Sequence, residues 1–315
     1  MLAFLKSFVE EEQKARRRTA ERRIEAQTRL NRFVDLVNPQ IRCVSGWEKT
    51  LSPSVEALWA YVQAEILAKL PAVVPFDYPA IGQDEKTGNS ELLRVLFAAP
   101  ERLTNCLNSP DLWENGATET CALLTVQEAW KTSFGSALQK GQIIRDVQQT
   151  SLLFTNPSFL CLSPTEEGMR DAFAVYLFEE RARFLKADIE EHRQSLARSR
   201  GALPQIPCGD AETPAESLRN PAIYFRALCE RIKDLPQSIS MRECSCKLSV
   251  RSNQLLGDND KDASFAVVLH QLYTGRWQRV VLPVYCQKPE DYDTAKEKRL
   301  KASMAGLSAN RFSFR

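Results

Sequence analysis

The first 37 residues constrain the fold most, because they contain neither proline nor glycine before Pro39. Most of them are Ala, Glu, Gln, Lys, Arg or Leu, which are strong helix formers. One helix over this stretch would span roughly 54 Å at 1.5 Å per residue. A single globular domain does not need such a helix, and we predict a long basic helical arm over residues 1–38.

The apolar residues of this stretch gather at its two ends, while its middle is polar and basic. Between Glu10 and Arg29 the only bulky aliphatic residue is Ile24, so the middle cannot bury an ordinary apolar stripe. Three readings remain open: a solvated helix with ion pairs four residues apart, a helix that docks on a protein partner, and an arm that binds phosphate or a membrane surface. The predicted partner-binding residues are Phe4, Phe8, Phe33 and Val34. If the arm binds phosphate, the predicted nucleic-acid-binding residues are Arg16, Arg17, Arg18, Arg22 and Arg23, together with Lys298, Arg299 and Lys301 near the other end of the chain.

Composition is that of a globular protein, with 43% apolar and 26% charged residues among 315. The net charge of +2 is unevenly placed, because residues 1–32 and 296–315 are basic and residues 33–295 are acidic. An acidic body with basic ends argues against a body that wraps DNA. It favours self-association or a composite surface.

The nine cysteines are an odd number scattered along the chain, unlike a small secreted disulfide framework. No signal peptide is recognisable, since the first apolar run is interrupted at Lys6. No stretch approaches the roughly 20 apolar residues of a membrane span. We therefore expect a cytoplasmic protein with reduced thiols and no transmembrane segment.

Residues 39–200 are expected to form a helical body. Apolar residues recur at helical spacing from Val55 to Leu70, after the start signal Ser52-Pro53. Further helices are predicted over residues 118–134 and 136–148.

A β-hairpin is predicted over residues 150–162, where two apolar runs flank the turn sequence Thr155-Asn-Pro-Ser158. Helices followed by a hairpin are the order of a winged helix. A wing that reads DNA normally brings lysine or arginine to phosphates, and this turn has neither. A winged-helix-like module at this place would equally serve to dock a protein.

A second long helix is predicted over residues 164–200. Ser163 is a cap, Pro164 occupies the first helical position, and Glu166 completes a capping box. The first half of this helix is apolar and the second half is polar. We expect it to pair with the N-terminal arm, with the acidic residues of 188–191 facing Arg16 to Arg23.

Proline and glycine without periodicity mark residues 201–220 as a linker. A helix then starts at Pro221, and the pattern changes to the alternation of strands up to residue 287. Residues 221–315 are therefore expected to form a small C-terminal α+β domain with an antiparallel three-stranded meander. The whole chain is predicted to have an α+β fold that is predominantly α-helical.

Candidate chemistry is sparse, because His192 and His270 are the only histidines. Cys244, Cys246 and His270 are weak candidates for a metal site, since neighbouring strands would bring them close together. Cys-x-Cys lacks the usual zinc-knuckle spacing, however, and no fourth ligand is in reach. No cofactor is expected.

No motif for nucleotide hydrolysis, dinucleotide binding, a serine hydrolase or a zinc protease occurs in the chain. The sequence therefore predicts a non-catalytic interaction or assembly subunit of a multi-protein complex. The alternatives are a nucleic-acid-associated protein with basic ends, and a divergent metal-dependent nuclease or cysteine hydrolase.

Overall fold

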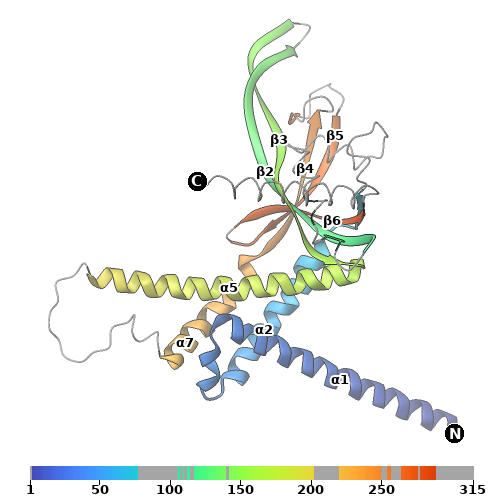
Figure 1. Ribbon diagram of the computed structural model, residues 1–315, viewed down its shortest axis with the longest axis vertical. Coiled ribbons are helices and arrows are strands. Elements are labelled where there is room, and N and C mark those ends of the chain that lie inside the picture. The colour runs from blue at the N-terminus through green and yellow to red at the C-terminus, as the bar shows by residue number, and fades with distance from the viewer. Residues whose placement is uncertain are drawn as a thin grey trace, which may run out of the picture. The chain divides into compact units, whose positions relative to one another are not determined.

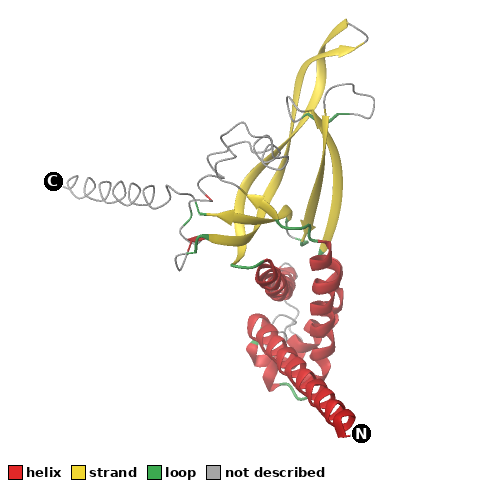
Figure 2. Ribbon diagram, turned by 90° about the vertical axis from the view of Figure 1, so that its right-hand side faces the viewer, coloured by secondary structure: helices red, strands yellow, loops and turns green. Residues whose placement is uncertain are grey.

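The computed structural model describes residues 2–76, 106, 109, 112–113, 117–139, 142–201, 220–249, 254–256, 264–275 and 277–288. Within these ranges the side chains of residues 2–10, 137–139, 142, 193, 196–201 and 265 are not described. The chain divides into two compact units: unit 1 is Met1–Ala68 and Ala174–Ile239, and unit 2 is Lys69–Phe173 and Ser240–Arg315. All the named strands belong to unit 2, and Figure 2 distinguishes them by colour from the helices.

Unit 1 is helical. Its elements are α1 (Leu2–Val37), the short helix η1 (Pro39–Cys43), α2 (Trp47–Tyr61), its continuation η2 (Val62–Ile66), η3 (Leu67–Lys69), most of α5 (Glu166–Gly201), α7 (Pro221–Arg231), η6 (Ile232–Asp234) and η7 (Pro236–Ser238). The core lies where the C-terminal part of α1 meets α2, α5 and α7. Phe178 is central to it: its ring lies 5.9 Å from that of Phe33 and 5.8 Å from that of Trp59, centroid to centroid.

A polar contact at the edge of this core joins α1 to α2. Arg29 donates two hydrogen bonds to the carboxylate of Glu56, at 3.2 and 2.8 Å, and its guanidinium lies 5.0 Å from the ring centroid of Trp59. Such paired hydrogen bonds fix orientation as well as adding energy. Arg29 therefore marks the point along α1 from which the helix packs against the rest of unit 1.

Helix α2 begins earlier than the sequence predicted. Its N-cap is Gly46, in the left-handed region at φ 73°, and Pro53 lies inside the helix. The cap signal at Ser52-Pro53 is overridden because Trp47 and Leu51 are both buried in the core, and their burial stabilises a further turn and a half of helix.

Unit 2 contains an antiparallel sheet in the order β3-β2-β6-β5-β4. The strands are β1 (Val74–Phe76), β2 (Glu119–Gln139), β3 (Gln142–Ser163), β4 (Ser240–Ser249), β5 (Ser264–Tyr273) and β6 (Gln278–Gln287), and β1 pairs in parallel with β6 (Figure 1). The buried face is lined by alternate residues of these strands, among them Leu124, Val267 and Val284. Phe76 and Trp113 join the same core.

A short segment at residues 254–256 connects the two edge strands of this sheet. Gln254 bridges to Ser151 on β3, and Leu255 bridges to Leu248 on β4. The backbone N–H of Leu255 donates to Thr150 at 2.8 Å, and the N–H of Ser249 donates to Gln254 at 2.8 Å. Residues 254–256 therefore link the edge of β3 to the edge of β4 and cover both edges at this level. This link makes the sheet barrel-like.

The prediction of a predominantly α-helical fold is wrong, and the error lies mainly in residues 118–148. The helices predicted over 118–134 and 136–148 are instead strand β2 and the first part of β3. Residues 120–126 are buried on both faces of β2, and five of these seven residues are apolar, so the stretch does not show the alternation of a half-buried strand. Such a run cannot be distinguished from a buried helix by periodicity alone.

The predicted hairpin at 150–162, and with it the winged-helix-like module, is also wrong. Residues 142–163 form one strand that pairs with β2 along its whole length. The turn sequence at Asn156-Pro157 produces a β-bulge, with Asn156 at φ 50°, and the chain does not reverse there. The actual reversal joins β2 to β3 between Gln139 and Gln142.

The three C-terminal strands are antiparallel neighbours, but they do not form a small sheet of their own. Strand β6 pairs with β5 only at Gln278–Val280, and it pairs with β2 over Val280–Gln287. The loop between β5 and β6 covers residues 274–277, with Gly275 at φ 75°. The predicted linker at 201–220 lies almost wholly outside the described residues.

Candidate interaction surfaces

Strands β2 and β3 extend well beyond the rest of the sheet. Strand β6 pairs with β2 only as far as Val126, whereas β2 and β3 remain paired to their connection. We call residues 127–139 of β2 and 142–155 of β3 the β-arm. Each strand of the β-arm covers roughly 40 Å at 3.3 Å per residue. Figure 1 shows it as the long two-stranded ribbon beyond the other strands.

Three β-bulges lie along the β2–β3 ladder, the last of them within the β-arm, and all of them insert the extra residue into β3. The register shifts opposite Cys121–Leu123, Thr125–Gln127 and Gly135–Ala137. The bulged stretches of β3 contain Cys161, Asn156 and Asp146, which are non-glycine residues with φ of 57°, 50° and 58°. Bulges bend a strand and increase its twist. Because β2 carries no insertion, its side chains alternate regularly along the whole β-arm.

Because of this alternation, the buried face of the sheet continues onto the β-arm as an exposed face, on which large apolar side chains lie among polar ones such as Thr132 and Gln148. Leu124 and Val126 are buried, whereas Trp130 and Phe134, on the same side of β2, are 46% and 72% exposed. Ile143 pairs with Leu138 on that side and is 72% exposed. We call Trp130, Phe134 and Ile143 the aromatic stripe. Trp130 and Phe134 together expose roughly 250 Å² of surface, which is a large share of an apolar patch for a monomer.

The base of the β-arm is held by side-chain hydrogen bonds. Gln254 Nε2 donates to Gln149 Oε1 at 2.5 Å, and Gln271 Nε2 donates to Glu128 Oε1 at 2.5 Å. The first hydrogen bond connects β3 to the segment of residues 254–256, and the second connects β2 to β5. These contacts orient the β-arm where it leaves the sheet, so that it presents the aromatic stripe on a supported ribbon.

Helix α1 forms a second projecting element. Every residue from Glu11 to Glu25 is exposed, including Ile24 at 67%. Arg16 pairs with Glu12 at 2.6 Å, while Arg17, Arg18, Arg22 and Arg23 make no ion pair with described residues. A solvated helix of this kind contributes little to the core. We call residues 11–25 the helical arm; in Figure 1 it lies in the projecting half of α1.

The four predicted partner-binding residues fall in different environments. Phe33 and Val34 are completely buried in the core of unit 1, so they support the fold of α1 and offer no surface to a partner. The side chains of Phe4 and Phe8 lie outside the described residues, as do Lys298, Arg299 and Lys301.

The predicted pairing of the two long helices occurs, but through other residues. Arg32 on α1 forms an ion pair with Glu179 on α5, next to the contact between Phe33 and Phe178. Asp188 pairs with Arg231 on α7 and does not face the arginines of the helical arm. The aromatic contact sets where the two helices meet, and this position leaves Arg16 to Arg23 in solvent.

The register of the sheet separates the weak metal candidates. Cys244 pairs with Leu269 and Cys246 with Val267, whereas His270 pairs with Glu243. Cross-strand partners share a face and successive residues alternate, so His270 points away from the two cysteines. Among the described residues, no group of three potential ligands is close enough to hold a metal ion.

Thiol chemistry gives no support to a cysteine hydrolase. Burial raises the pKa of the Cys161 and Cys286 thiols to about 12. Burial also raises the pKa of Cys106, Cys121, Cys229 and Cys246. A catalytic cysteine requires the opposite shift, toward the thiolate. The thiols of these buried or partly buried cysteines are therefore poor nucleophiles.

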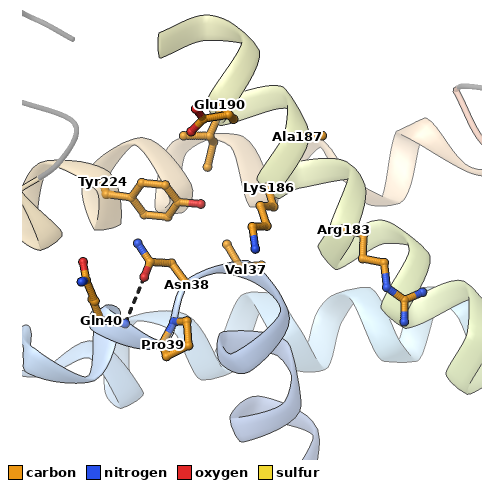
Figure 3. Close-up of a pocket in the computed structure, with 10 residues that line it drawn as sticks. Val37, Asn38, Pro39, Gln40, Arg183, Lys186, Ala187, Glu190 and Tyr224 are labelled. Atoms are coloured by element: carbon orange, nitrogen blue, oxygen red, sulfur yellow. Dashed lines mark hydrogen bonds between the residues drawn. The ribbon is translucent and has the colours of Figure 1, made fainter. Parts of the chain in front are cut away.

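A shallow cavity of about 650 Å³ lies in unit 1 where η1, α5 and α7 meet (Figure 3). Lys186 and Arg183 reach its rim from α5, and Tyr224 enters from α7. The Oδ1 of Asn38 is engaged in capping η1, at 3.0 Å from the N–H of Gln40. Lys186 and Arg183 are both exposed, so the lining resembles ordinary protein surface more than a preformed ligand site.

Arg181 is the largest completely buried side chain in the described part of the chain. Its guanidinium donates to Ser238 Oγ at 3.3 Å and lies 4.8 Å from the ring centroid of Phe184. Ser238 Oγ in turn donates to the carbonyl of Leu235 at 2.7 Å. This chain of contacts fastens η7 to α5, which gives Arg181 a structural role inside unit 1.

Comparison with known proteins identifies no relative: no family model, no curated protein and no solved structure matches this chain. Within the described ranges, none of the helices combines the length and apolar character needed to cross a membrane. The protein is therefore described by its fold alone: a helical unit that carries the helical arm, and a barrel-like sheet unit that carries the β-arm.

Sequence reasoning missed the β-arm, which is the most conspicuous surface feature of unit 2. A signal was present, since Trp130, Thr132 and Phe134 alternate with polar residues and are aromatic or β-branched, as strands prefer. Gly135 also disfavours a helix at this point.

Proposed function

We propose that this protein is a non-catalytic interaction or assembly subunit that binds a protein partner through the β-arm. The aromatic stripe carries the proposal. Trp130 and Phe134 continue the core face of the sheet, yet no described part of the chain covers them. Exposed aromatic residues of this kind are enriched at protein interfaces, where they supply most of the binding energy.

The β-arm suits binding better than catalysis. It presents few charges, since Glu128, Lys131, Arg145 and Asp146 are its only charged residues in the described part. It therefore offers little general acid, base or metal chemistry. A two-stranded ribbon standing alone is only marginally stable in water, so contact with a partner would stabilise it.

Replacing the two aromatic residues of the aromatic stripe, without disturbing the fold, tests this proposal. The tagged chain is isolated from its natural host, and its mass is measured by light scattering coupled to size exclusion. We expect the wild type at a mass above that of one chain and the double variant W130S/F134S at the mass of one chain. Ile144→Ser is the matched control, because Ile144 is exposed on the other face of the same ribbon.

Two results would contradict the proposal. One is a wild type that is isolated as a single chain with nothing bound. The other is a W130S/F134S variant that keeps the wild-type mass while its circular dichroism is unchanged.

A second candidate, nucleic-acid association, is favoured by the arginines of the helical arm that form no ion pair within the described part of the chain. Arg17, Arg18, Arg22 and Arg23 are exposed and have no described carboxylate partner, so they are available to phosphates. Fluorescence anisotropy with a DNA duplex over a salt series tests this reading. Binding should weaken steeply with salt and be lost in R17A/R18A/R22A, whereas Arg42→Ala should leave it unchanged, because Arg42 already pairs with Asp35.

Absence of salt-dependent binding to the duplex would remove this second candidate and would leave the first untouched. Binding that persists in R17A/R18A/R22A would place the contact elsewhere on the protein.

A further inference from the structure

One long edge of the β-arm is open to a further strand. Strand β6 covers the edge of β2 up to Val126, and beyond it residues 127–139 have no partner on that side within the described chain. Exposed edges are usually blunted by lysine, proline or a bulge. Along this stretch β2 carries a single lysine, Lys131, no proline and no inserted residue. The edge is therefore a template for an additional strand.

The sequence of this edge is complementary to itself. If two copies of β2 pair in the antiparallel direction about Thr132, Trp130 of each copy lies opposite Phe134 of the other. Thr132 then lies opposite its own symmetry mate, and Lys131 lies opposite Ser133. Aromatic–aromatic and threonine–threonine pairs are among the favourable cross-strand pairs, and no like charges face each other.

The same register agrees with the length of the open edge. Pairing about Thr132 matches Gln127 with Ala137 of the other copy, so the ladder would start directly after the last residue that β6 covers. A shift by one residue would place the aromatic side chains of the two copies on opposite faces of the joined sheet. Pairing about Ser133 would also use the open edge and keep the aromatic side chains on one face. Only pairing about Thr132 places Trp130 of each copy opposite Phe134 of the other, and this contact selects the centre.

We propose that the β-arm pairs with the β-arm of a second copy of this chain, edge to edge along β2, with Thr132 on the two-fold axis. This inference rests on the proposed function and names the partner. The joined ribbon has four strands in the order β3-β2-β2-β3. Trp130 and Phe134 from both copies form one aromatic cluster on its face, and the β2 edge of each ribbon gains a lateral partner that the described part of the chain does not provide.

Replacing Thr132 with a charged residue tests this arrangement, because a residue on the two-fold axis lies opposite the same residue of the other copy. Thr132 is exposed in the single chain, so its replacement leaves the fold of each chain intact. We expect the wild type to be dimeric in sedimentation at micromolar concentration. Thr132→Lys and Thr132→Glu should each dimerise roughly tenfold more weakly, because like charges meet. An equimolar mixture of the two variants should recover the dimer.

Gln148 provides the matched control. It is exposed on the same face of the ribbon, opposite Phe134, but it belongs to β3 and so lies away from the pairing edge. Gln148→Lys and Gln148→Glu should both dimerise as the wild type does. Thermal unfolding of each variant confirms that its chain is folded.

Any other pattern overturns the inference. A wild type that is monomeric at these concentrations, charge variants that dimerise like the wild type, or a mixture that stays monomeric each exclude pairing about Thr132. The proposed function fails separately, since a monomeric wild type that still binds another protein through Trp130 and Phe134 would keep the β-arm as a docking surface and exclude only the second copy as its partner.

Discussion

Trp130 and Leu152 are cross-strand partners on the same face of the β2–β3 ladder, yet Leu152 is completely buried and Trp130 is 46% exposed. The core of unit 2 ends between these two side chains. Beyond them the same face continues toward Phe134 without cover from the described chain. Strand β6 stops pairing with β2 at Val126, four residues before Trp130, while β2 and β3 continue, so this face loses the neighbouring strand shortly before the Trp130–Leu152 pair.

The bulge at Asn156 predicts a specific response to substitution. Asn156 has φ 50°, and its Nδ2 donates to Gln127 Oε1 at 3.1 Å. Asparagine tolerates the left-handed region, whereas a β-branched residue does not. Asn156→Val should therefore lower the free energy of unfolding by about 1–2 kcal/mol, as measured by urea denaturation.

Asn156→Gly is the control for that experiment, because glycine adopts positive φ without strain. It should stay within about 0.5 kcal/mol of the wild type. If valine and glycine have equal effects, the cost comes from the lost side-chain hydrogen bond, and the backbone of the bulge is not the cause.

Substitutions in the two halves of α1 should have different effects on the free energy of unfolding. Phe33 is completely buried against Phe178, so Phe33→Ala should lower the free energy of unfolding by about 3–5 kcal/mol. Ile24, which is 67% exposed on the same helix, should tolerate Ile24→Ala within about 0.5 kcal/mol. Urea denaturation of both variants checks this contrast, and equal effects would contradict the boundary between core and helical arm.

The ion pair between Asp35 and Arg42 predicts a small dependence of stability on pH. A hydrogen bond from Arg42 lowers the pKa of the Asp35 carboxyl below its ordinary value of 3.8, and the folded state therefore favours the charged form. The stabilisation is present above pH 3.8 and is lost as pH falls through the lowered pKa of the folded state. Thermal melts of the wild type and Asp35→Asn should differ above that value and converge in stronger acid.

Both residues of this pair are exposed on the surface, so the difference in melting temperature should shrink at high salt. A difference that persists unchanged at high salt, or that grows in acid, would contradict the assignment to Arg42.

The cysteines predict an order of reactivity. Cys43 is exposed, whereas burial raises the pKa of Cys161 and Cys286 to about 12. Alkylation of the native protein at mildly alkaline pH, followed by peptide mass spectrometry, should label Cys43 and spare Cys161 and Cys286. In denaturant all three should react. Equal labelling in the native state would contradict the raised pKa of these two sheet cysteines.

The raised pKa values of Cys161 and Cys286 also determine how the free energy of unfolding depends on pH in alkaline solution. The folded state holds the two thiol protons up to about 12, while the unfolded chain releases them near 9.0. The free energy of unfolding should therefore be at its full value below pH 9.0 and decrease as pH rises from there toward 12. Cys161→Ser, in which the group no longer titrates in this range, should show a shallower decrease.

The sequence by itself determined the elements whose signals are local. Helix α1 ends at Val37, where Pro39 follows, and α7 starts at Pro221 with Asn220 as its cap. The start of α5 was close to its predicted position: Thr165 Oγ1 accepts the N–H of Gly168 at 3.1 Å, two residues after the predicted cap at Ser163. In each case the capping hydrogen bonds join residues that are only a few positions apart, so the local sequence specifies where the helix begins or ends.

The conformation of residues 119–163, and the surface that they create, depend on contacts between segments that are distant in the chain. A strand satisfies its backbone through partners that are distant in the chain, and β2 takes one of its partners, β6, from more than 150 residues away. Whether Trp130 and Phe134 are core or surface depends on where β6 ends, which their own neighbours in sequence do not specify. Strand pairing is a long-range property, and for this reason the β-arm became visible only in the fold.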